Sequence, residues 1–349
     1  MISRLLVAAA AAVLLCSSAR ADDDCHMTTY GTSTMAQLPG ETSEFLPVEI
    51  GGQQKLLLID TGGAITMIKT SLVRELGLKP SDSGVELFDV TGRKSNLFVY
   101  APLNIVDVKL NQIPFMLATP YIEGLGGSRV AGLLGANFMR NFDISIDFGA
   151  HTFAMFSQKH CDGKVVYWPE RPIVVIPFEL RGDQIILTVT LDGHDFKALL
   201  DTGASGTTLE RSRAEGNFDI VLGSADTPRG GDFDEKRDSF WKHHFKSLSF
   251  GGIEVSNPEI DIIPDLMSTN SDSFSTGSML DRKYNNQEQP PMLLGMNVLR
   301  HLHLYIAYKE RKLYVTPGGT PPPGYAPLPP LPPAPVPKDD TDEAQGPNH

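Results

Sequence analysis

Apolar residues alternate with polar or small residues most clearly in two stretches of the chain, residues 142–148 and 302–308. Side chains that alternate in this way bury one face of a β-strand. Little beyond residues 71–78 and a short turn after each of two Leu-Leu-Gly sequences favours helix. The pattern therefore predicts an all-β fold.

The chain repeats itself around two Asp-Thr-Gly triplets. Residues 58–62 (LIDTG) align with residues 199–203 (LLDTG) at an offset of 141 positions (201 − 60), and the same offset aligns Gly51-Gly52 with Asp192-Gly193. These dipeptides predict two-residue hairpin turns, because Gly-Gly and Asp-Gly tolerate the positive φ that such turns need. Each triplet is therefore expected to follow a β-hairpin.

A second pair of matching segments has a different spacing. Residues 133–137 (LLGAN) align with residues 293–297 (LLGMN) at an offset of 160 positions (295 − 135), and the two alternating stretches keep that offset. The change of 19 positions (160 − 141) predicts an insertion in the second copy. Its candidates are two polar stretches, residues 226–242 and 268–289, which we expect to form surface loops.

The repeat divides the chain into two related β-rich lobes, residues 45–157 and 173–316, with a linker at residues 158–172. An N-terminal arm, residues 22–44, precedes the first lobe. With 349 residues, of which 41% are hydrophobic, the chain is long enough to bury a substantial core.

Residues 1–21 have the pattern of a secretory signal peptide: Arg4, an apolar stretch at 5–15, and Ala19-Arg20-Ala21 before the cleavage point. The expected location is outside the cytoplasm, either periplasmic or secreted. A membrane anchor is the alternative, but the stretch is shorter than the roughly 20 apolar residues that span a bilayer. Lipid attachment at Cys16 is disfavoured by the bulky Leu15 before it.

The composition changes after Thr316, where 11 prolines fall between residues 317 and 337 and an acidic end follows at 338–349. We expect residues 317–349 to be a disordered tail, extended and unpacked. A Pro-rich ligand for a partner domain is the functional alternative.

The net charge limits the classes of partner, and the cysteine content allows one disulfide. The net charge of −12, without a Lys/Arg-rich block, argues against nucleic acid as a partner. After signal cleavage Cys25 and Cys161 remain, and an oxidising compartment allows them to form a disulfide between the arm and the linker. Two free or separately buried thiols are the alternative.

Histidines could suggest a metal site, since His301 and His303 lie at i and i+2 and would share one face of a strand. They align, however, with Asn141 and Asp143, so we expect polar positions that face solvent. No metal and no cofactor are predicted. No Gly-x-Ser-x-Gly sequence supports a serine hydrolase.

The duplicated triplets and Leu-Leu-Gly segments resemble the pepsin and retropepsin family of aspartic proteases over residues 45–316. The resemblance implies two retropepsin-like β-barrel lobes related by a pseudo-twofold axis, which brings Asp60 and Asp201 together in a cleft. Two adjacent carboxyl groups can act as base and acid for hydrolysis by water. They cannot both ionise easily, so one proton is shared by the pair.

The resemblance also assigns supporting roles around this dyad. The threonine hydroxyls would reach across to the opposite loop, one pair of glycines would leave room at the carboxylates, and another pair would let a second strand pass close behind. In that order the residues are Thr61 and Thr202, Gly62 and Gly203, and Gly135 and Gly295.

Two features place the chain nearer the retropepsin branch. Gly63 and Ala204 follow the triplets where pepsins carry Ser or Thr, which predicts a higher pKa for the pair and activity nearer neutral pH. Both lobes lie in one chain, which predicts a monomer. The flap is expected at Val90, Thr91, Gly92 and Arg93, without an equivalent of the pepsin flap tyrosine.

The predicted function is that of an aspartic endopeptidase that cleaves a peptide or protein substrate held between the lobes. The alternative is a catalytically silent protein of the same fold that binds peptides or acts as a scaffold in the cell envelope.

Overall fold

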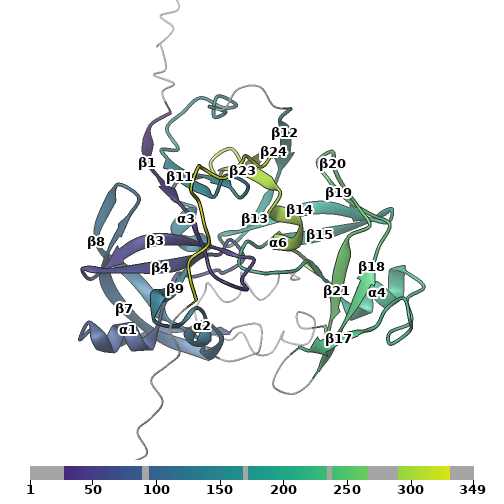
Figure 1. Ribbon diagram of the computed structural model, residues 1–349, viewed down its shortest axis with the longest axis horizontal. Helices are drawn as coiled ribbons and strands as arrows, with labels where there is room; N and C mark the ends of the chain where they lie inside the picture. Colours follow the sequence, from purple (N-terminus) through teal and green to yellow (C-terminus); the bar gives the residue numbers. More distant parts are fainter. Residues whose placement is uncertain (1–26, 89–93, 168–171, 234–237, 266–289, 331–349) are drawn as a thin grey trace, which may run out of the picture.

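The computed structural model describes residues 27–88, 94–167, 172–233, 238–265 and 290–330. These residues form three β-sheets (Figure 1). An eight-stranded sheet comes from the first half of the chain, a ten-stranded sheet comes from the second, and a six-stranded sheet takes strands from both. The predicted all-β, two-lobed fold is confirmed.

The first half contains, in order, β1 (Thr29–Thr34), β2 (Ala36–Gln37), β3 (Glu44–Ile50), β4 (Gln53–Ile59), β5 (Met67–Ile68), α1 (Thr70–Glu75), β6 (Ser81–Phe88), β7 (Lys94–Ile105), β8 (Val108–Leu117), α2 (Pro120–Gly124), a 3-10 turn (Gly127–Arg129), β9 (Val130–Leu134), α3 (Ala136–Met139), β10 (Asp143–Asp147) and β11 (Thr152–Phe156).

The second half contains β12 (Val174–Pro177), β13 (Glu179–Arg181), β14 (Gln184–Leu191), β15 (His194–Leu200), β16 (Thr208–Glu210), α4 (Arg211–Asn217), β17 (Arg229–Asp232), β18 (Ser239–His244), β19 (Ser247–Phe250), β20 (Ile253–Ser256), β21 (Glu259–Ile263), β22 (Met292–Leu294), α6 (Met296–Leu299), β23 (Leu302–Ala307) and β24 (Lys312–Pro317). No helix among the described residues is long and apolar enough to cross a membrane.

The hairpins before the triplets form as the sequence predicts. β3 and β4 are joined by Gly51 and Gly52 with φ of 57° and 82°, and β14 and β15 by Asp192 and Gly193 with φ of 46° and 85°. Two consecutive residues with positive φ twist the turn to match the right-handed twist of the paired strands. The hairpins therefore deliver both triplets from equivalent strand ends.

Strand pairing in the two lobes follows one register. β3 pairs with β7 at Ile50 and Leu103, and β14 pairs with β19 at Leu191 and Leu248. The first partners are 141 positions apart (191 − 50) and the second are 145 apart (248 − 103). The insertion is therefore divided: four residues (145 − 141) precede β19 and fifteen (160 − 145) fall between β21 and β22.

The two predicted insertion loops have different outcomes. Residues 226–242 are not simply a loop, because β17 and β18 pair antiparallel there and β18 joins β21 in the ten-stranded sheet. Polar composition concealed this hairpin, since an edge hairpin needs few apolar residues. The second candidate, residues 268–289, lies outside the described residues.

The six-stranded sheet joins the halves in the order β1-β11-β10-β23-β24-β12. The two alternating stretches of the sequence form β10 and β23, which pair antiparallel at its centre. β1, from the predicted N-terminal arm, forms one edge, as β12 does at the other edge. The repeated unit therefore begins before residue 45.

The expectation that His301 and His303 face solvent is wrong for His303, which is only 6% exposed. His303 Nε2 lies 2.7 Å from Ser145 Oγ on the neighbouring strand, and Ser145 also bonds Tyr167. Residues of the linker cover this face of the sheet, with Val165 buried in the same cluster as Tyr305 and Tyr314. Polar positions on the sheet are therefore buried by a segment that periodicity does not reveal.

The prediction of an unpacked tail is wrong for residues 317–330, which we call the strap. The strap runs from β24 across the first lobe towards α2 (Figure 1). Tyr325 stacks on His151 with ring centroids 3.9 Å apart, the Leu328 N–H donates to the Gln37 carbonyl at 2.9 Å, and Arg129 bonds the Pro329 carbonyl. Residues 331–349 lie outside the described residues.

Candidate active site

Asp60 and Asp201 each follow the strand that ends a repeated hairpin, β4 or β15. The Asp60 N–H donates to the Leu134 carbonyl at 3.1 Å, and the Asp201 N–H donates to the Leu294 carbonyl at 3.0 Å. These bonds extend the parallel pairings of β4 with β9 and of β15 with β22. Both aspartates are therefore fixed at equivalent positions at the inner ends of the two lobes.

The two carboxyl groups share a hydrogen bond, as the sequence predicts for a dyad. Burial between the lobes raises the pKa of both groups. The negative charge of Asp60 raises the pKa of Asp201 further, whereas hydrogen bonds from Gly63, Asp201 and Gly62 oppose the rise for Asp60. Burial and the repulsion between two carboxylates therefore favour a pair that holds one shared proton.

Backbone donors surround each carboxyl group. The Gly63 N–H donates to Asp60 Oδ1 at 2.6 Å. In the second loop, Asp201 Oδ1 accepts from the N–H groups of Gly203 at 2.8 Å and Ala204 at 3.1 Å. Charge-assisted bonds of this kind favour the ionised form and hold the carboxylates in place.

The threonines lock the two loops together, as the resemblance implies. Thr61 Oγ1 donates to the Leu200 carbonyl at 2.7 Å and accepts from the Thr202 N–H at 3.1 Å. Thr202 Oγ1 donates to the Ile59 carbonyl at 2.7 Å and accepts from the Thr61 N–H at 3.1 Å. Both threonines are buried, so neither pair of bonds competes with water.

The glycines leave space for specific atoms of the opposite loop or strand. A Cβ at Gly62 would lie 2.2 Å from the Asp201 Cγ, and one at Gly203 would lie 2.6 Å from the Asp60 Cγ. Gly135 and Gly295 face backbone instead, with a Cβ at 2.6 Å from the Ile65 carbonyl carbon and 2.2 Å from the Gly206 oxygen, respectively. The first pair thus admits the opposite carboxyl groups, and the second admits the Asp loops themselves.

A second symmetric contact between the lobes was missed from the sequence. Ser43 Oγ donates to the Gly203 carbonyl at 3.3 Å, and the Gln184 amide donates to the Gly62 carbonyl. Ser43 and Gln184 are 141 positions apart (184 − 43), so the offset of the triplets could have identified the pair. Each fixes the glycine of the opposite triplet from outside the dyad.

An asparagine in each lobe supports its Asp loop. The Asn137 side-chain oxygen accepts from the N–H and the hydroxyl of Thr66, at 2.8 and 2.9 Å, and the Thr66 hydroxyl accepts from the Gly135 N–H. Asn297 and Thr207 repeat this arrangement at 2.9 and 2.7 Å. The asparagines end the repeated LLGAN and LLGMN segments, where a sequence signal for them was present.

The predicted flap residues, Val90 to Arg93, lie outside the described residues. The strands on either side of them, β6 and β7, pair antiparallel. Its counterpart in the second lobe is the β17–β18 hairpin, because β18 continues into β19 as β7 continues to its pairing with β3.

An aromatic residue near the dyad comes from α2 rather than from the flap. Tyr121 is 59% exposed and lies within the electrostatic field of the dyad. Burial, together with the charges of Glu41, Asp60 and Asp201, raises the pKa of its phenol.

The remaining predicted site residues are the cysteines. Cys161 is disulfide-bonded. Its predicted partner, Cys25, lies outside the described residues, so their pairing stays a prediction. Across the described part of the chain, no group of three or more His, Cys, Asp or Glu residues is arranged to hold a metal ion.

Comparison with known proteins places this site in a family. No curated protein sequence matches the chain. Among solved structures, the aspartic proteinase from Irpex lacteus matches with a TM-score of 0.46 and 10% sequence identity, covering 82% of this chain and 98% of that chain. The family model for aspartyl protease matches residues 46–138 and 187–298, which include both triplets. The chain therefore belongs to the aspartyl protease family.

Proposed function

We propose that this protein is an active aspartic endopeptidase whose catalytic residues are Asp60 and Asp201. The observation that carries the proposal is the hydrogen bond between the two buried carboxyl groups. Two carboxyl groups that share one proton can act together as the base and the acid of the reaction.

In the proposed reaction, Asp60 takes a proton from water as its oxygen attacks the peptide carbonyl carbon. Asp201 gives its proton to the carbonyl oxygen, which yields a neutral tetrahedral diol. Asp60 then returns its proton to the amide nitrogen as the C–N bond breaks, and Asp201 recovers a proton from the diol as the new carboxyl group forms. The locked threonine loops keep both carboxyl groups aligned during these transfers.

Tyr121 is proposed to contact the substrate. The charges of both dyad carboxyl groups contribute to the raised pKa of its phenol, and its helix is held by the buried Ile122. Residues on the opposite rim of the cleft are expected to come from the β17–β18 hairpin.

The test uses the mature chain and an unfolded protein substrate between pH 4 and 7. Wild type should cleave the substrate, and Asp60→Asn and Asp201→Asn should each lower the rate by at least about a thousandfold, because each removes one partner of a coupled proton transfer. Both variants should remain folded, since a neutral amide replaces a buried carboxyl with a raised pKa. A wild type without cleavage, or an asparagine variant that retains it, would refute the proposal.

The pH profile tests the proposed environment of the pair. Raised pKa values keep one proton on the dyad towards neutral pH, so the rate should remain high above pH 5. A rate that peaks sharply near pH 2 would contradict this.

We also propose that the protein is exported, on the signal-peptide pattern of residues 1–21. N-terminal sequencing of the protein recovered outside the cytoplasm should begin near Asp22. Recovery in the cytoplasm with Met1 retained would contradict export.

A further inference from the structure

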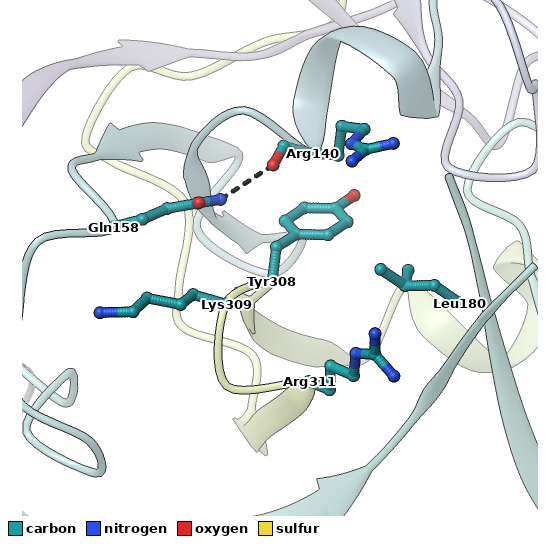
Figure 2. Close-up of a pocket in the computed structure, with 6 residues that line it drawn as sticks. All are labelled: Arg140, Gln158, Leu180, Tyr308, Lys309 and Arg311. Atoms are coloured by element: carbon teal, nitrogen blue, oxygen red, sulfur yellow. Dashed lines mark hydrogen bonds between the residues drawn. The ribbon is translucent and has the colours of Figure 1, made fainter. Parts of the chain in front are cut away.

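A pocket of about 250 Å³ lies where the two halves of the chain meet (Figure 2). The first half contributes Arg140, at the end of α3, and Gln158; β13 contributes Leu180. Tyr308, Lys309 and Arg311 come from the turn between β23 and β24. A ligand in this pocket would therefore touch both halves.

The lining is cationic in a protein of net charge −12. Arg140 pairs with Asp183, beside the pocket. Within the described part of the chain, the side chains of Lys309 and Arg311 have no hydrogen bond or ion pair. Two positive charges thus remain uncompensated at the turn, which favours an anion.

A buried hydroxyl at the pocket also lacks a partner. Tyr308 is 5% exposed, and its Oη makes no hydrogen bond to any described residue. In Figure 2 this hydroxyl is directed towards Arg140. Burial, with the charges of Asp183 and Asp143, raises the pKa of Tyr308, so the hydroxyl stays protonated and can donate. A buried polar group without a partner is unfavourable until something bonds it.

We propose that this pocket binds a small tetrahedral oxyanion of the phosphate and sulfate class. Arg140 and Arg311 supply guanidinium donors, whose geometry suits oxyanions, and Tyr308 Oη supplies the buried donor. Arg140 ends α3, and Tyr308 and Arg311 come from the β23–β24 turn, so a bound anion would contact both halves of the chain (Figure 2). A tetrahedral anion can accept from several directions, whereas a planar carboxylate offers its oxygens in one plane.

The test measures thermal unfolding and calorimetric binding with phosphate, sulfate, acetate or chloride at one ionic strength. Phosphate and sulfate should raise Tm saturably relative to chloride, because a ligand that binds only the folded state stabilises it. Arg311→Met should weaken phosphate binding at least about tenfold, as expected for the loss of a charge-assisted bond. Lys79→Met, which removes an exposed positive charge elsewhere, should leave binding unchanged.

Tyr308→Phe separates ligand binding from a structural role. It removes only the hydroxyl, so phosphate affinity should fall about tenfold while Tm in chloride does not decrease. A lower Tm in chloride would show that the hydroxyl already has a structural partner, which would overturn the proposal. No saturable response to phosphate or sulfate, an equal response to acetate, or equal losses for Arg311→Met and Lys79→Met would overturn it as well.

Discussion

The two lobes build the same backbone frame with different side chains around it. The hydrogen bonds of the threonines and asparagines recur at equivalent positions, with distances that agree within about 0.2 Å. Next to this frame, however, Gly63 corresponds to Ala204, and Glu44 corresponds to Ile185. The repeated hydrogen bonds therefore identify the interactions that hold the aspartate pair in both lobes. The differing residues identify features that belong to one lobe only.

The backbone donors at the dyad are equivalent in the two lobes. Asp201 Oδ1 accepts from Gly203 and Ala204, and Asp60 is bonded by the corresponding Gly62 and Gly63, the latter at 2.6 Å. The difference between the loops is therefore the Cβ of Ala204, which Gly63 lacks. One chain that contains both lobes can evolve such a difference, because each aspartate loop mutates independently.

The largest effect is expected for the threonines, where the lobes should behave alike. Thr61→Val and Thr202→Val each leave one buried carbonyl and one buried N–H without partners, which should lower the free energy of unfolding by about 3 kcal/mol. Denaturant unfolding measures both variants. If the two variants lose free energies of unfolding that differ by more than about 1 kcal/mol, the threonine hydrogen bonds are not equivalent in the two lobes.

At the position that follows each Asp-Thr-Gly triplet, substitutions should affect the two lobes differently. A Cβ added in Gly63→Ala would lie 2.6 Å from Asp60 Oδ2 and 3.2 Å from Leu133 Cδ1. Moving the carboxyl group by about 1 Å to relieve this contact should reduce kcat/KM about a hundredfold. The reverse change, Ala204→Gly, should alter it only a few-fold, because it removes a Cβ that the second loop already accommodates.

Peptide cleavage by the two variants measures this difference, with circular dichroism as the control for folding. Equal losses for Gly63→Ala and Ala204→Gly would mean that the two loops are equally crowded. The asymmetry inferred from the two loops would then be wrong.

The sequence predicted the strands and loops that carry the two aspartates, but it did not predict the segments that pack over the sheets. The hairpins, the triplets and the strands β10 and β23 follow from repeated local patterns, and the threonine lock follows from the family resemblance. Helix α4 was missed because Arg211–Asn217 contains Ser212 and Gly216, which are weak helix formers. Its position 141 residues after α1 (211 − 70) was the available signal.

Features that depend on distant segments could not be predicted from local composition. His303 is buried because the linker covers the six-stranded sheet, and the strap is ordered because Leu328 and Tyr325 meet complementary surfaces on the first lobe. A Pro-rich sequence indicates extended backbone, but it does not say whether a surface exists to receive it. Only the fold supplies that surface.

The strap is a further difference between the lobes, since it contacts the first lobe at Gln37, Arg129 and His151. Ending the chain after Thr316 should lower the free energy of unfolding by about 2 kcal/mol, from the burial of Leu328 and the ring stacking of Tyr325. Ending it after Pro330 should have no measurable effect. Chemical denaturation of both truncated proteins tests this, and equal stabilities would show that the strap does not contribute.

A final difference between the lobes is Glu44, the buried carboxyl that has Ile185 as its counterpart. Glu44 is 3% exposed, and burial raises its pKa to about 8 from 4.5. Because the folded state holds the proton more tightly, the stabilisation is complete below pH 4.5 and is lost as the pH rises through about 8. His151 Nδ1, 2.8 Å from Glu44 Oε1, opposes part of this loss when its N–H donates.

Glu44→Gln keeps an acceptor for His151 and removes the charge. Its free energy of unfolding relative to wild type should increase between pH 4.5 and 8, because glutamine does not ionise in the range in which the buried wild-type carboxyl does. Glu254→Gln, at an exposed position of the second lobe, should show no such change and is the matched control. Denaturant unfolding at pH 4.5, 6 and 8 measures the difference. If the free energies of unfolding of Glu44→Gln and wild type change in parallel across that range, burial does not control the ionisation of Glu44. The first lobe would then tolerate this carboxyl because His151 neutralises it.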